Sequence, residues 1–154
     1  MKLKVDEEEV FLDPTNLEVD EVNLNDFLKE FSGTYNYYNT MWAKAQLIQR
    51  TFEDRYENTL NDRYVFFKMN DGGSDKLAEA KAKIHDSVVQ AKKTMQTAKY
   101  VTQQLNGYLR SLDKAHEDAL NLGYNLRKEM DKLYPNSIGA SADKGMAKLM
   151  EEQG

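Results

Sequence analysis

The sequence contains no cysteine and only two prolines among its 154 residues, and each absence excludes a class of structure. Without cysteine the chain has no disulfide, no thiolate metal site and no thiol nucleophile. No apolar run approaches the roughly 18 residues of a membrane span, and the acidic start is unlike a signal peptide. These absences, with only eight glycines, predict a soluble helical protein in the cytoplasm, without a membrane partner.

One apolar position recurs every seven residues through a stretch without proline between Asp75 and Tyr134. A period of 3.5 residues keeps one seam facing a neighbour, which predicts a long helix in a coiled coil or bundle. An unbroken helix of this stretch would be about 85 Å long, so it must pack against other copies or against a second long helix. The nine seam positions are Leu77, Ile84, Ala91, Ala98, Leu105, Leu112, Ala119, Leu126 and Leu133.

A second long amphipathic helix is predicted over residues 35–69, where apolar residues recur at spacings of three and four. The loop Asn70–Asp75 separates it from the helix predicted over residues 75–134. Two long helices joined by a short loop form an antiparallel hairpin. The expected fold is therefore all-α, a short N-terminal helix plus a long helical hairpin, with coiled-coil-like self-association.

The shorter segments complete a single helical domain. Residues 1–18 are expected to form an extended acidic arm, and residues 23–31 a short helix that ends at Ser32–Thr34. Within the long helix, Asn106–Gly107 is the most favourable place for a kink. Residues 135–154 are expected to form a flexible tail or a short helix.

The net charge of −5 conceals an uneven distribution. Residues 1–31 hold ten acidic residues and three lysines, whereas residues 76–112 hold seven basic and two acidic residues. A basic stretch beside an acidic arm indicates an anionic partner for the basic stretch. The acidic arm is a candidate contact for a protein partner, or a mimic of DNA that tunes occupancy of the DNA site. A solvated helix face explains the basic stretch equally well without any partner.

Residues suited to catalysis are scarce. His85 and His116 are 31 residues apart, and no motif for a metal or for a bound nucleotide accompanies them. The pair Gly72–Gly73 indicates a turn rather than a phosphate-binding loop. The sequence therefore predicts a protein that is not an enzyme and needs no cofactor.

The end of the second helix combines cations and aromatic residues next to the loop. Such a surface can pair with phosphates and stack bases without reading their sequence, although the aromatics could instead belong to the core. Further lysines follow after the loop. The candidate DNA-binding residues are Arg63, Phe66, Lys68, Lys76, Lys81, Lys83, Lys92, Lys93 and Lys99.

The leucine-rich seam suggests how copies of the chain associate. Thr102 and His116 are polar residues at the second apolar position of the heptad repeat. They favour a multi-helix or ring-like assembly over a two-stranded zipper, and an intramolecular bundle also fits. The candidate oligomerisation residues are Leu77, Ile84, Leu105, Leu112, Leu126 and Leu133.

Four motifs occur in an order that resembles one protein family. They are Val10–Leu17, Tyr35 with Tyr38, Arg63–Phe67 and Gly72–Gly73. In order and spacing they resemble the UvsY-type phage recombination mediators, which load a recombinase onto single-stranded DNA coated by single-strand-binding protein. The chain departs from the family in its acidic net charge and in Asn61, which stands where the family has a second basic residue.

The resemblance implies a specific function and set of partners. The protein would bind single-stranded DNA without sequence preference, contact a recombinase and single-strand-binding protein, and form a homo-oligomeric ring of roughly six or seven subunits. The resemblance also places Arg63 at the DNA site. The alternatives are a coiled-coil structural or adaptor protein with no nucleic-acid role, and an inhibitor that acts through its acidic surface.

Overall fold

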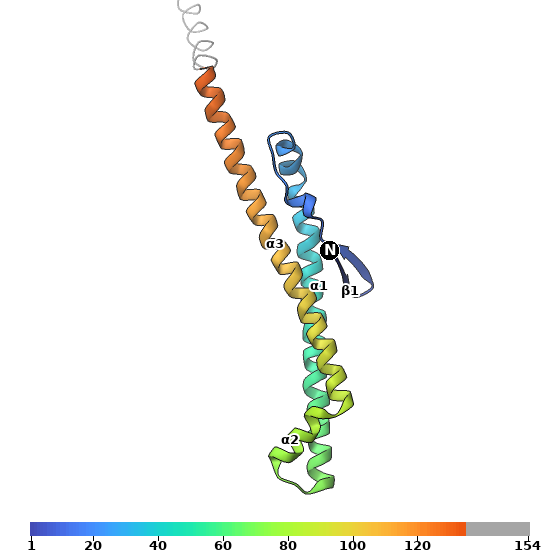
Figure 1. Ribbon diagram of the computed structural model, residues 1–154. Coiled ribbons are helices and arrows are strands. Elements are labelled where there is room, and N and C mark those ends of the chain that lie inside the picture. Colours follow the sequence, from blue (N-terminus) through green and yellow to red (C-terminus); the bar gives the residue numbers. More distant parts are fainter. Residues whose placement is uncertain (135–154) are drawn as a thin grey trace, which may run out of the picture.

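The computed structural model describes residues 1–134, which fold mainly into a long helical hairpin (Figure 1). Helix α1 spans Leu24–Asp71, helix α2 spans Asp75–Ile84 and helix α3 spans Asp86–Leu133. α1 and α3 pack against each other along the hairpin, and α2 packs beside the end of α1. This confirms the all-α hairpin that the sequence predicts; the predicted tail over residues 135–154 lies outside the described residues.

The N-terminal arm is a two-stranded antiparallel ribbon. Strand β1 (Lys2–Val5) pairs with strand β2 (Glu8–Phe11), and Lys2 lies opposite Phe11. Alternate residues of β1 are buried, because successive side chains of a strand point to opposite faces. Asp6, in the turn between the strands, has a φ of +56°, a left-handed conformation that aspartate tolerates better than most residues.

Two buried tyrosines attach the N-terminal segment to the hairpin. Tyr38 of α1 and Tyr108 of α3 meet edge to face, with ring centroids 4.6 Å apart. The Tyr38 hydroxyl donates to the carbonyl oxygen of Phe11 at 2.7 Å, and the Tyr108 hydroxyl donates to that of Asp13 at 2.6 Å. Asp13 caps a 3₁₀ helix, η1 (Pro14–Leu17), so these bonds hold the strand ribbon and the turn after it.

The core lies where the strand ribbon, α1 and α3 meet. Residues from all three elements are buried there, which explains why the acidic arm is ordered against the helices. Its members are Leu3, Val5, Val10, Leu12, Tyr38, Met41, Ala45, Leu105, Tyr108, Leu109 and Leu112.

Helix α1 continues through Ser32–Thr34, so the predicted break at this position is wrong. The Phe31 ring stacks on the imidazole of His116 in α3, with centroids 4.1 Å apart. One turn later, the Tyr35 hydroxyl donates to Asp113, also in α3, at 3.5 Å. These contacts on both sides of Gly33 compensate the roughly 1 kcal/mol by which glycine disfavours a helix.

The helix predicted over residues 75–134 is interrupted at His85, so this prediction is also wrong. His85 has the extended backbone angles φ −68° and ψ 136°, and its Nδ1 accepts the backbone N–H of Ser87 at 3.3 Å, capping α3. The bend lets α2 fold onto the end of α1, where Ala78 and Ala82 are buried. This packing favours the bend over a continuous helix.

Helix α3 extends past the beginning of α1, as Figure 1 shows at its orange end. It runs unbroken through Gly107, the residue at which a kink was expected, and through Gly123. A Cβ atom on Gly123 would lie 3.6 Å from the side chain of Leu24, the first residue of α1. The ten residues from 124 to 133 that follow extend α3 by about 15 Å beyond this contact.

Candidate nucleic-acid interface

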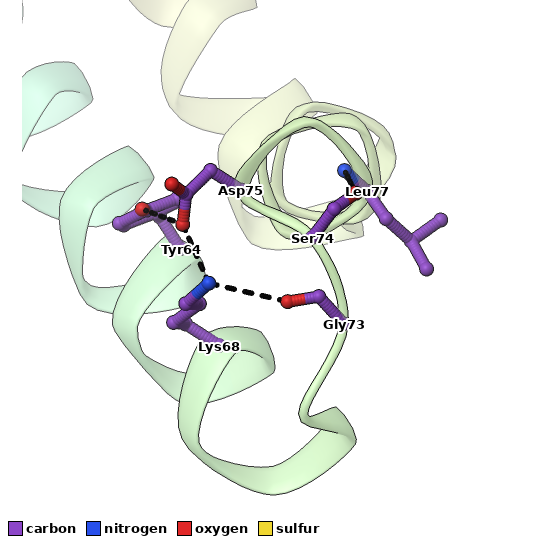
Figure 2. A network of polar contacts seen from close by, with 6 residues as sticks. All are labelled: Tyr64, Lys68, Gly73, Ser74, Asp75 and Leu77. Atoms are coloured by element: carbon purple, nitrogen blue, oxygen red, sulfur yellow. Dashed lines mark hydrogen bonds and ion pairs between the residues drawn. The ribbon is translucent and has the colours of Figure 1, made fainter.

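Lys68 closes the loop at the tip of the hairpin (Figure 2). Its Nζ lies 2.6 Å from an Asp75 carboxylate oxygen and donates to the Gly73 carbonyl oxygen at 3.2 Å. The Tyr64 hydroxyl donates to the same Asp75 oxygen at 3.1 Å. The bond from Lys68, followed by the bond from Tyr64, holds the pKa of Asp75 below its ordinary value, and Asp75 in turn raises the pKa of Lys68.

Two further lysines of the predicted DNA site are also paired with carboxylates. Lys81 Nζ lies 2.5 Å from an oxygen of Asp71, so it joins α2 to the end of α1. Lys83 Nζ lies 2.5 Å from an oxygen of Glu79, one turn earlier in α2. A lysine that binds phosphate would have to leave its carboxylate, so the charge these residues offer to DNA is partly neutralised.

Arg63 and Phe66 remain available at the tip of the hairpin. The guanidinium carbon of Arg63 lies 5.9 Å from the centroid of the Phe66 ring, and Phe66 is 50% exposed. Lys76, in the first turn of α2, is exposed and makes no ion pair within residues 1–134. The structure thus leaves a partly buried cation beside a half-exposed aromatic ring, with a second cation at the start of the next helix.

The three lysines predicted to form one track along α3 do not lie on one face. Lys92 and Lys99 are seven residues apart and share a face of the helix. Lys93 is offset from Lys92 by about 100° around the helix and lines the groove between α1 and α3. All three are exposed and lie outside the ion pairs found in residues 1–134.

The surface beside Lys93 is hollowed into a groove. It has a volume of about 610 Å³ and lies between α1 and α3, beside the turn of the strand ribbon. Its floor is apolar and its rim carries Lys4 and Lys93. The apolar floor consists of Val5, Ala45, Ile48, Phe52, Ala98 and Val101.

The predicted oligomerisation residues separate into two groups. Leu105 and Leu112 are 0% exposed in the core of the hairpin, so α1 already covers them and they are unavailable to a second copy. Ile84 and Leu133 are 76% and 73% exposed, and Leu77 is also exposed. Leu126 is partly buried. The assignment of Leu105 and Leu112 to an interface between copies is therefore wrong, whereas the exposed residues remain candidates.

The histidines have structural partners. His85 caps α3, and His116 stacks on Phe31. Residues 1–134 contain no group of three or more histidine, aspartate or glutamate side chains placed to hold a metal ion. In the same residues, every helix is too short or too polar to cross a bilayer.

Comparisons with protein-family models, with curated proteins and with solved structures give no match to this chain. The likeness to the UvsY-type mediators is therefore a likeness in the order of short motifs. One of these motifs is structural in this chain, because Tyr38 belongs to the core. Another contains the half-exposed Phe66 and, beside it, the partly buried Arg63 near the tip of the hairpin.

Proposed function

We propose that the protein binds single-stranded DNA without sequence preference and helps to load a recombinase onto DNA coated by single-strand-binding protein. The observation that carries the proposal is the position of Arg63 beside the half-exposed ring of Phe66. A guanidinium group can bind a phosphate while the neighbouring ring stacks on a base, and neither contact depends on the sequence. The resemblance supports the recombinase and single-strand-binding protein as partners.

The contacts at the tip suggest a different role for each residue of the site. Arg63 and Lys76 supply positive charge for phosphates, and Phe66 supplies a stacking surface. Lys68 holds the loop in place through Asp75 and Gly73, so its contribution to DNA binding is indirect. One chain would therefore make few contacts with the phosphates, and we expect its intrinsic affinity for DNA to be low.

Assembly of several copies would compensate for this low affinity. The seam residues Leu77, Ile84 and Leu133 leave apolar surface open at both ends of the hairpin, where a second copy can cover it. In a ring or other closed oligomer, several tips would bind one DNA strand at once. Linked binding sites raise the apparent affinity by orders of magnitude without any new contact.

A titration of fluorescent oligo-dT at two salt concentrations tests the DNA site. The double variant Arg63→Ala, Phe66→Ala should bind about tenfold more weakly or worse, with a shallower dependence on salt, because it loses a phosphate contact in every subunit. The matched control is Leu47→Ala, Arg50→Ala, which also removes one exposed apolar side chain and one arginine from α1.

The control should bind oligo-dT within about twofold of the wild type. Circular dichroism and light scattering should show that both variants keep the helicity and size of the wild type. If the Arg63, Phe66 variant binds as tightly as the control, DNA does not bind at the tip.

A coiled-coil adaptor without a nucleic-acid role is the second candidate. The observation that favours it is the pairing of Lys68, Lys81 and Lys83 with carboxylates, which lowers the positive charge near the tip. An adaptor would form the same oligomer through its apolar ends. It would show no binding to oligo-dT even at low salt, where phosphate contacts are strongest.

A further inference from the structure

The groove between α1 and α3 is longer than its main hollow. A second depression of about 270 Å³ shares Phe52, Gln90 and Thr94 with it and continues toward the start of α3. Together the two depressions follow α3 from Ser87 to Val101, a distance of about 21 Å. An elongated hollow between two helices has the shape that accommodates one side of a third helix.

The lining of the groove is better suited to bind apolar side chains than nucleic-acid bases. Its floor is aliphatic except for Phe52, so it offers little surface for stacking. The hydroxyls of Thr94 and Thr97 donate to the carbonyl oxygens of Gln90 and Lys93 in the preceding turn, at 3.1 Å in each case. These two hydroxyl protons are therefore already used, and the threonine methyl groups add to the apolar surface.

The charges around the groove favour an acidic occupant. Lys4 and Lys93 lie on its rim and Arg55 lines its second depression. None of the three forms an ion pair within residues 1–134, where Lys2, Lys44, Lys68, Lys81 and Lys83 each have an acidic partner. The acidic residue in the lining is Asp6. Cations without counterions around an apolar floor attract an anionic, amphipathic ligand.

We propose that this groove binds the apolar face of an acidic amphipathic helix supplied by a partner protein. The aliphatic side chains of that helix would cover Ile48, Phe52 and Val101, and its carboxylates would pair with Lys4, Lys93 and Arg55. The groove lining does not include Arg63 or Phe66, so the partner helix and DNA would contact different residues.

The probe for this site is a fluorescein-labelled peptide of about 16 residues, with leucine on one helical face and glutamate on the other. Its binding is followed by fluorescence anisotropy with the full chain. One control peptide has the same composition in an order that spreads the leucines around the helix, and a second has lysine in place of glutamate. We expect both controls to bind about tenfold more weakly than the probe or worse.

Two matched pairs of variants locate the binding site. Lys4→Glu, Lys93→Glu should weaken peptide binding about tenfold, whereas Lys92→Glu, Lys99→Glu, on another face of α3, should change it less than about twofold. Thr97→Trp places a large side chain in the groove from an exposed position, and it should abolish peptide binding. Gln103→Trp, exposed and outside the groove lining, is its control.

Three results would overturn the proposal. The first is failure of the probe to bind, or equal binding of the probe and the control peptides. The second is equal binding by the groove variants and their controls. The third is displacement of the peptide by oligo-dT together with loss of oligo-dT binding in Thr97→Trp, which would make the groove a nucleic-acid site.

Peptide binding by the Arg63→Ala, Phe66→Ala variant separates this proposal from the proposed function, because that variant keeps the groove intact.

Discussion

The middle of the hairpin and its two ends follow the same sequence repeat but have different surroundings. In the middle, Leu105 and Leu112 are completely buried between α1 and the strand ribbon. At the ends, Ile84 lies beyond the bend before α3 and Leu133 lies beyond the start of α1, and both are largely exposed. A heptad repeat therefore identifies a face that needs a partner, while the lengths of the neighbouring elements decide which partner covers each part.

The difference between the two regions also separates stability from assembly. Side chains buried within one chain contribute to its folding, whereas exposed apolar side chains contribute when a second copy covers them. The middle of the hairpin should therefore govern the free energy of unfolding of a single chain. The ends should govern the size of the oligomer.

The largest expected effect comes from truncating the middle of the seam. Leu105→Ala should lower the free energy of unfolding by about 2–5 kcal/mol, because it opens a cavity in a fully buried site. Ile84→Ala should change it by less than about 0.5 kcal/mol at a protein concentration low enough to dissociate oligomers. Urea unfolding followed by circular dichroism measures both values, and similar losses would contradict the distinction between middle and ends.

An intermediate effect is expected where the N-terminal segment attaches to the middle of the hairpin. Tyr108→Phe removes the hydroxyl that donates to the Asp13 carbonyl oxygen and accepts from the Asn16 side chain at 3.1 Å. The loss should be about 1–3 kcal/mol, because partners of a buried hydroxyl are left unsatisfied. Tyr100→Phe, on an exposed part of α3, is the control and should be neutral. Equal melting temperatures for the two variants would show that the hydrogen bonds of the Tyr108 hydroxyl add no stability.

The smallest effect concerns the ion pair at the tip. Because Lys68 lowers the pKa of Asp75 below its ordinary value of 3.8, the unfolded chain takes up this proton first as the pH falls. The contribution of Asp75 to stability is thus present above that ordinary value and is lost as the pH falls through the lower, folded-state pKa. In alkaline solution the stabilising effect of this ion pair persists until the pH passes the raised pKa of Lys68, which lies above 10.5.

Thermal melts of the wild type and Asp75→Asn across this pH range test the assignment. The melting temperature of the wild type should be slightly higher at pH values near neutrality, and the difference should disappear in acid, as the pH falls through the lowered folded-state pKa of Asp75. A difference that persists unchanged in acid would mean that the carboxylate is not responsible for it.

Local patterns in the sequence were sufficient to predict the hairpin but not its details. The seven-residue repeat and the Gly72–Gly73 loop predict two long helices that fold back on each other. The break expected at Gly33 is absent, because Phe31 and Tyr35 pack on a helix some 80 residues away in sequence. The bend at His85 was missed, because no proline or glycine marks it and the gain comes from packing α2 on α1.

The candidate sites depend even more on contacts between distant residues. The sequence identifies Lys68 and Lys81 as basic, but only the fold shows that Asp75 and Asp71 lie within reach of them. The groove was not predicted at all. It brings Lys4 of the strand ribbon together with residues near positions 48 and 93, and no local pattern connects these segments.

Light scattering at micromolar concentration gives the most direct test of the difference between the middle and the ends, using the wild type and the variant Ile84→Glu, Leu133→Glu. We expect the wild type to be a stable oligomer, because its exposed seam residues cover one another between copies. The variant should be a folded monomer with the helicity of the wild type, because neither substitution touches the core. A monomeric wild type, or a variant that keeps the oligomeric mass, would show that the ends of the hairpin do not join copies of the chain.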